Sequence, residues 1–231
     1  MRHEDGYAWV FTNNREVISF YKPTREGGFL KEFLKDFNGI LVSDFYTAYD
    51  SINCLQQKCL IHLIRDLNDD LLKNPFDGEF KFMTHNFSTL LQNIVKTIDK
   101  YGLKRRHLNK HKKEVNAFFK MLNACKYSSE TASHYKERFL KNIDKLFQFL
   151  DHDNVSWNNN NAEHAIKLLA THTNKKIKLF STTRIDEYLN IMSVYQTCVY
   201  HDISFFKFLL SRERDLDKYL RKVSKNPLKP I

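Results

Sequence analysis

Long apolar runs are missing from the sequence. No stretch of its 231 residues approaches the roughly 18 uncharged apolar residues that a membrane-spanning helix needs. The N-terminal segment MRHEDGYAWVF also lacks the basic-then-apolar order of a secretory signal peptide. We therefore expect a cytoplasmic protein without a membrane partner.

Cysteine is scarce as well. The four cysteines, Cys54, Cys59, Cys125 and Cys198, have no paired spacing. This favours reduced thiols in a reducing compartment over a disulfide framework.

Glycine and proline are so rare in the middle of the chain that helices can run almost without interruption. From about Cys59 to His152 the clear helix breaker is Pro75. Apolar side chains there recur with a helical period, as at Phe87, Leu90, Leu91, Ile94, Ile98 and Tyr101. The region is predicted to be a helical block.

The flanking regions have other patterns. The segments YAWVFTN and EVISFY are predicted to be strands, followed by a helix over GFLKEFLKDF, a stop at Gly39 and a strand over ILVSDF. After Trp157, helices are predicted over 160–173, 184–200 and about 205–210, and the basic tail beyond Tyr219 is predicted to be mobile. The fold class is thus α/β, in segments 1–58, 59–156, 157–212 and 213–231.

Positive charge exceeds negative charge. Lysine and arginine total 37 against 27 acidic residues, and the excess gathers in KRRHLNKHKK at 104–113, in KKIK at 175–178 and near the C-terminus. Such clusters suit a polyanion such as nucleic acid, because each neutralised phosphate releases counterions. They are also typical of solvated helix faces, so charge alone leaves both interpretations open.

Four consecutive asparagines stand in WNNNNAEHAIK, residues 157–167. Asn160 could cap the following helix, with Glu163 three residues on completing a capping box. One asparagine is enough for a cap, so the other three call for a further explanation.

Two carboxylates stand out on this frame. Asp44 follows an apolar strand, where α/β sheets present their site residues, and Glu163 lies in the first turn of a later helix. Acidic oxygens from different elements are what a two-metal phosphoryl-transfer site requires, although two acids alone leave such a cluster incomplete. The competing interpretation of Asp44 is an N-cap for the segment from Thr47 onward.

Five segments, in order and over nearly the whole chain, resemble transposases of the insertion sequence 66 family. They are FNGILVSDFYTAYD, KCLIHLIRDL, NNNNAEHAIK, TNKKIKLF and SVYQTCVYHDISFFKFL. The resemblance implies a ribonuclease-H-like core with an Asp-Asp-Glu triad and a helical insertion before the Glu. It also implies Mg²⁺-dependent DNA cleavage and strand transfer. The expected partners are transposon ends and target DNA, with a homodimer possible.

The family's residues map onto this chain by motif. The second Asp falls on Asp44, in a stretch with Tyr46 and Tyr49, and the Glu falls on Glu163 behind Asn159 and Asn160. The resemblance therefore implies that Asp44 and Glu163 are catalytic and hold the metal, and that the asparagines lead into the catalytic helix.

Cys59 and His62 form a C-x-x-H that also matches the family. Zinc is not expected there, because a structural zinc site needs four ligands and no second pair lies nearby in the sequence. We expect this Cys and His to pack and hydrogen-bond beneath the site.

DNA-binding residues are expected at several basic positions. Where the family has a cation directly after the Glu, this chain has His164, and the next basic position is Lys167 in place of the usual Arg. The remaining candidates are Lys175 and Lys176, which match a family pair, and Lys104, Arg105 and Arg106 of the first basic cluster.

The family's first Asp, on the first core strand, has no counterpart here, because the sequence reaches Tyr7 almost at once. Glu4 and Asp5 precede a strand and are poor substitutes. We therefore expect an incomplete core with an exposed strand edge, in a truncated and largely inactive copy whose true start could lie upstream of Met1. The alternatives are a non-catalytic DNA-binding fragment and a helical protein-interaction module.

Overall fold

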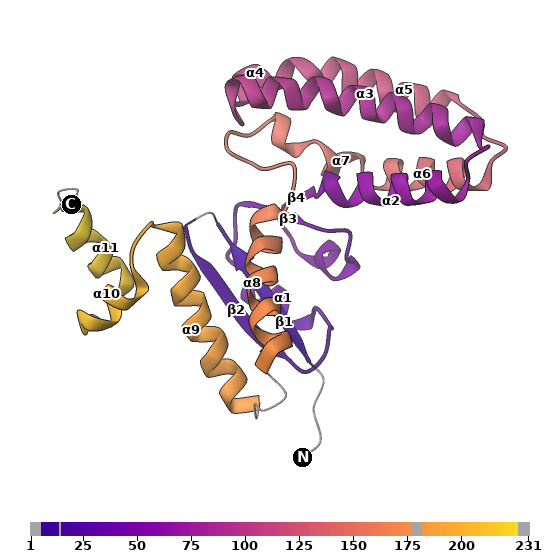
Figure 1. Ribbon diagram of the computed structural model, residues 1–231. Helices are drawn as coiled ribbons and strands as arrows, with labels where there is room; N and C mark the ends of the chain where they lie inside the picture. Colours follow the sequence, from indigo (N-terminus) through magenta and orange to yellow (C-terminus); the bar gives the residue numbers. More distant parts are fainter. Residues whose placement is uncertain (1–5, 14, 177–181, 226–231) are drawn as a thin grey trace. The chain divides into compact units, whose positions relative to one another are not determined.

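The computed structural model describes residues 6–13, 15–176 and 182–225, without the side chains of 171–176, 182–183 and 224–225 (Figure 1). The chain forms two compact units: residues 1–25 with 160–231, and residues 26–159. The predicted segment 1–58 is thus shared between both. Within the described residues, no helix is long and apolar enough to span a membrane.

The first unit contains the predicted hairpin. Strands β1 (Tyr7–Thr12) and β2 (Val17–Lys22) pair antiparallel, with Trp9 opposite Phe20. Asn13 shapes the connection, because its Oδ1 accepts hydrogen bonds from the backbone N–H groups of Arg15 (3.0 Å) and Glu16 (2.8 Å). Helices α8 (Asn160–Lys176) and α9 (Thr182–Tyr200) pack against β1 and β2 respectively (Figure 1).

Helix α9 covers the outer edge of β2. The backbone N–H of Val17 donates to Thr197 Oγ1 at 3.0 Å, and that of Ser19 donates to Ser193 Oγ at 2.9 Å. Both hydroxyls in turn donate to carbonyls of their own helix. These hydroxyls close the outer edge of β2 against pairing with another chain. The edge that the sequence predicts to be exposed is a different one, that of the strand next to the missing first strand, and it stays a prediction.

The end of the chain departs from the prediction. After α10 (Phe205–Leu210) comes α11 (Leu216–Lys225), which includes residues 220–225 of the predicted mobile tail. The Tyr219 ring packs edge-on against Phe208 at 5.3 Å, and Lys222 Nζ lies 2.7 Å from Glu213 Oε2. The chain is thus helical up to Lys225, where the sequence predicts no helix, and residues 226–231 lie outside the described part.

The second unit begins with a short helix and a parallel strand pair. Helix α1 (Gly28–Phe33) is shorter than predicted, and strand β3 (Ile40–Ser43) is followed by the 3₁₀ helix η1 (Thr47–Ser51). Strand β4 (Leu55–Lys58), which the sequence pattern did not predict, pairs parallel to β3.

The predicted helical block is present. It comprises α2 (Leu60–Lys73), α3 (Gly78–Tyr101), α4 (Arg105–Leu108), η2 (Asn109–His111), α5 (Lys112–Ala124), α6 (Glu130–Lys141), α7 (Ile143–Leu146) and η3 (Gln148–Leu150). Its ends follow local rules: Asp77 accepts a hydrogen bond from Phe80 N at 2.8 Å to start α3, and Gly102, with φ +69°, ends it.

Aromatic rings from three of these helices form the centre of the block. The ring of Phe87 lies 5.0 Å from that of Phe139 and 5.8 Å from that of Phe118, and Phe80 stacks on Tyr135 at 5.0 Å. All of these rings except Phe118, which is 5 % exposed, are at most 1 % exposed. The block therefore has a core of its own.

Candidate active site

Asp44 lies at the carboxyl edge of the parallel pair β3–β4. Ser43, the last residue of β3, is in register with Lys58, the last of β4, and the backbone N–H of Cys59 donates to Ser43 O at 2.7 Å. Because parallel strands end at the same edge, Asp44 and Cys59 leave the sheet side by side. This is the edge at which open α/β sheets place ligand-binding residues.

The Asp44 carboxylate is held by the turn that follows it. Its Oδ1 accepts a hydrogen bond from the backbone N–H of Tyr46 at 2.9 Å. Helix η1 begins only at Thr47, with Tyr46 in the capping position, so Asp44 is not its N-cap. Oδ2 of Asp44 has no hydrogen-bond partner within the residues that the structure describes, so it could bind a cation.

A buried lysine stands at the same edge. Lys58 is 1 % exposed, and its Nζ lies 3.2 Å from Asp50 Oδ1 and 3.5 Å from Ser43 Oγ. Burial lowers the pKa of Lys58, against the opposing effect of Asp50 and, more weakly, Asp44. Burial alone would raise the pKa of Asp50, but the ammonium groups of Lys145 and Lys58 hold it below its ordinary value.

The sequence pattern did not identify Lys58 as a site residue. It belongs to LQQK, which has no apolar alternation, and Gln56 and Gln57 are buried with it. Gln57 Nε2 donates to Leu146 O at 2.8 Å, and its Oε1 accepts from Phe149 N at 3.2 Å. These distant backbone groups make a polar strand stable inside the unit, and no local signal announces them.

Cys59 connects this edge to the end of the same unit. It is fully buried in front of α2, its Sγ accepts a hydrogen bond from the N–H of Asn159 at 3.4 Å, and Leu60 N donates to Trp157 O at 3.0 Å. His62 lies in the first turn of α2 and is half-buried. The start of α2 is thereby attached to residues 157–159, the beginning of the asparagine run.

Glu163 belongs to the other unit. The boundary falls between Asn159 and Asn160, inside the asparagine run, and α8 begins at Asn160. In its own unit the first half of α8 is held by α9: Tyr200 OH donates to Asn161 O at 3.3 Å, and Gln196 Nε2 donates to Ala165 O at 3.2 Å. Glu163 is half-buried in the first turn. The helix segment that carries Glu163 is thus held within its own unit.

The predicted DNA-binding residues are spread over both units. Lys104, Arg105 and Arg106 are exposed at the start of α4, where Lys104 Nζ donates to Asn154 Oδ1 at 3.2 Å. Lys167 is exposed on α8. Lys175 and Lys176 lie in the last turn of α8, and their side chains are outside the described part.

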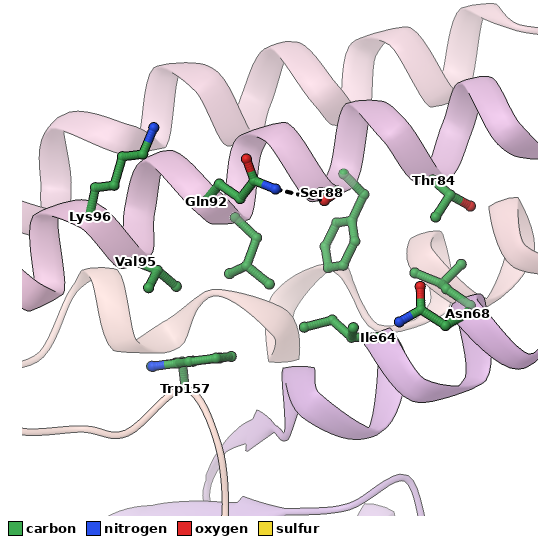
Figure 2. A pocket seen from close by; sticks show the side chains of 11 residues that line it. Ile64, Asn68, Thr84, Ser88, Gln92, Val95, Lys96 and Trp157 are labelled. Atoms are coloured by element: carbon green, nitrogen blue, oxygen red, sulfur yellow. Dashed lines mark hydrogen bonds between the residues drawn. The ribbon is translucent and has the colours of Figure 1, made fainter.

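An apolar cavity of about 350 Å³ opens in the helical block between α2 and α3, with the Trp157 ring at one end (Figure 2). Its wall includes Leu67, Phe87 and Leu91, and Ser88 accepts a long hydrogen bond, 3.4 Å, from Gln92 on its rim. None of the predicted site residues lines it. It is therefore separate from the edge that carries Asp44.

A comparison with protein families places the chain among known proteins. The family model described as "Transposase IS66 family" matches residues 1–186, which include both Asp44 and Glu163. No curated protein and no solved structure matches the chain.

Proposed function

The chain belongs to the IS66 family of transposases, and we propose that it carries two acids, Asp44 and Glu163, of a metal-dependent site for DNA cleavage and strand transfer in a ribonuclease-H-like core. The observation that carries the proposal is the family match across both residues. The position of Asp44 at the carboxyl edge of β3–β4 supports it.

Asp44 suits a hard cation. The Tyr46 N–H fixes Oδ1, which orients Oδ2 as a carboxylate ligand, and oxygen ligands are those that Mg²⁺ prefers. Glu163, in the first turn of α8, is the second proposed ligand. Bound Mg²⁺ would polarise the scissile phosphodiester and activate the attacking oxygen. Transposases of this type generally use a divalent metal, and Mg²⁺ is our specific proposal.

The proposed substrate is DNA, bound by a homodimer. The proposed backbone contacts are Lys104, Arg105, Arg106, Lys167, Lys175 and Lys176. Cys59, His62, Asn159 and Asn160 are proposed to support the site rather than to bind zinc. Since Glu4 and Asp5 are weak candidates for the third acid, we expect this chain by itself to have little strand-transfer activity.

Metal binding tests the two acids directly. Mn²⁺ titrated into the purified chain and followed by electron paramagnetic resonance should bind roughly tenfold or more weakly to Asp44→Asn and to Glu163→Gln. Asp36→Asn, which removes an exposed acid of the same unit as Asp44, is the matched control. Wild-type affinity in both site variants would refute the shared site.

The second candidate function is DNA binding without catalysis, which the exposed cations of α4 favour. It predicts a linear fall of log affinity with log salt that neither metal nor Asp44→Asn changes. Metal-dependent nicking or joining that disappears in both acid variants would exclude it.

A further inference from the structure

A second cavity lies wholly within the unit of residues 26–159. It has a volume of about 330 Å³ and lies between the segment after β3 and helix α6. Its walls are Phe45, Thr47, Asp50, Lys58, His134, Glu137, Arg138, Lys141 and Asn142. Phe45 directly follows Asp44, so the cavity begins at the proposed catalytic edge.

Two ammonium groups share one carboxylate in its wall. Lys58 Nζ and Lys145 Nζ lie 3.2 Å and 2.8 Å from the same oxygen, Oδ1 of Asp50. One negative charge therefore faces two positive charges. Since Lys58 is 1 % exposed, water solvates its charge poorly, and a further anion would stabilise it.

Arg138 lines the cavity from α6 and contacts two neighbouring side chains. Its Nη2 lies 2.5 Å from Asp66 Oδ2, and its guanidinium stands 4.4 Å from the centre of the Phe45 ring. Within the described residues, Nη2 is its one nitrogen with a hydrogen-bond partner, whereas a guanidinium carries five N–H donors. The remaining donors of a planar, pre-oriented fork suit phosphate oxygens.

Lys141 completes this wall one turn later on α6. It is exposed, and within the described residues its ammonium has no ion-pair or hydrogen-bond partner. Asn142 is positioned by donating to Arg138 O at 2.8 Å. Glu137 is the acid that opposes these groups from the same helix, and His134 lies one turn before Arg138.

We infer that this cavity binds a phosphate group of the DNA strand whose scissile bond reaches Asp44. Its contacts are Lys58, Arg138 and Lys141. The identification of the phosphate as one of DNA rests on the proposed function. A free phosphate ion has the same chemistry, and competition distinguishes the two sources. A phosphate held here would place the neighbouring phosphodiester of the strand beside Asp44.

Fluorescence anisotropy of labelled single-stranded and duplex DNA, measured without divalent metal over a range of salt, tests the cavity. Lys141→Gln should weaken binding of either DNA form about fivefold and lower the slope of log affinity against log salt by about 1. Lys120→Gln is the matched control, because Lys120 is an exposed lysine of the same helical block that does not line the cavity. Arg138→Lys, which keeps the charge but loses the fork, should also weaken binding.

Equal losses in Lys141→Gln and Lys120→Gln would overturn the inference, because the lysine in the cavity would then contribute no more than a surface charge. Pyrophosphate should compete with DNA for the wild type and less for Lys141→Gln. If the chain binds pyrophosphate in a Lys141-dependent way but binds no DNA, the phosphate site stands and its source is a free ion. Binding of neither probe overturns it.

The Mn²⁺ experiment and this one can fail separately. The Mn²⁺ titration reports on the two acids, and DNA binding without metal reports on the lysine of the cavity. Failure of the Mn²⁺ experiment alone would therefore refute the metal site of the two acids. Failure of the predicted change in the slope of log affinity against log salt alone would refute the phosphate site of the cavity.

Discussion

The two cavities of the unit 26–159 are similar in volume, about 350 and 330 Å³, and opposite in chemistry. The first lies between α2 and α3, and helical side chains at regular spacing form most of its wall (Figure 2). The second combines a sheet edge, a 3₁₀ helix and α6, and charged groups dominate it. The comparison separates a wall of packed apolar side chains from a wall of charged groups, which we propose to bind phosphate.

The largest effect is expected from Phe87→Ala. Phe87 is 1 % exposed, touches the rings of Phe118 and Phe139 and lines the apolar cavity. Its removal should cost about 3–5 kcal/mol of unfolding free energy, measured by urea denaturation. Phe82→Ala on the same helix is the control, since Phe82 is 53 % exposed and should cost under about 0.5 kcal/mol. Equal costs would show that this wall does not stabilise the block.

In the charged wall, the loss of stability should depend on which member of the Lys58–Asp50 ion pair is replaced. Asp50→Asn leaves the ammonium of Lys58 buried without its carboxylate and should cost about 2–3 kcal/mol. Lys58→Met should cost under about 1 kcal/mol, because Asp50 keeps Lys145. The double variant should recover most of the Asp50→Asn loss in urea denaturation. Simple additivity of the two losses would contradict the pairing.

The contribution of Lys58 in the charged wall to stability should change at alkaline pH. Because burial lowers the folded-state pKa of Lys58 below its ordinary 10.5, the unfolded chain binds more protons between the two values. The stability of the wild type relative to Lys58→Met should therefore rise with pH in that window and stay constant below it. Urea denaturation at several pH values measures the difference, and Lys120→Met should show no such rise. A fall would mean that Lys58 gains more from Asp50 than it loses by burial.

The smallest effect is expected at the one hydroxyl group that is buried in the apolar wall. Thr84 is 8 % exposed, and its Oγ1 has no hydrogen-bond partner within the described part of the chain. Thr84→Val should stabilise the protein by about 0.5–1 kcal/mol in urea denaturation. The control is Thr97→Val on the same helix, because that hydroxyl donates to Asn93 O at 3.2 Å and bonds His111 Nε2 at 2.8 Å. Thr97→Val should lower the unfolding free energy by about 1–2 kcal/mol. A comparable loss at Thr84 would reveal an ordered water in the cavity.

Much of the fold follows from the sequence. The period of Phe87, Leu91 and Ile94 predicts α3, the NR turn predicts the β1–β2 hairpin, and an apolar run predicts β3 directly before Asp44. These features depend on neighbours within a few residues of one another, so a local pattern is sufficient to reveal them. The family resemblance likewise depended on short local motifs, and the family match confirms it.

What the sequence determined by itself is the set of helices and strands that local side-chain patterns specify, together with the family. The tertiary structure alone decided that LQQK is a strand, that α9 covers the edge of β2, and that Lys58 and Arg138 line the same cavity. The hydrogen bond from Gln57 to Leu146 joins residues 89 positions apart, and that from Val17 to Thr197 joins residues 180 apart. Such partners exist only after the chain has folded, because a buried polar group is stable only where distant elements supply its hydrogen bonds.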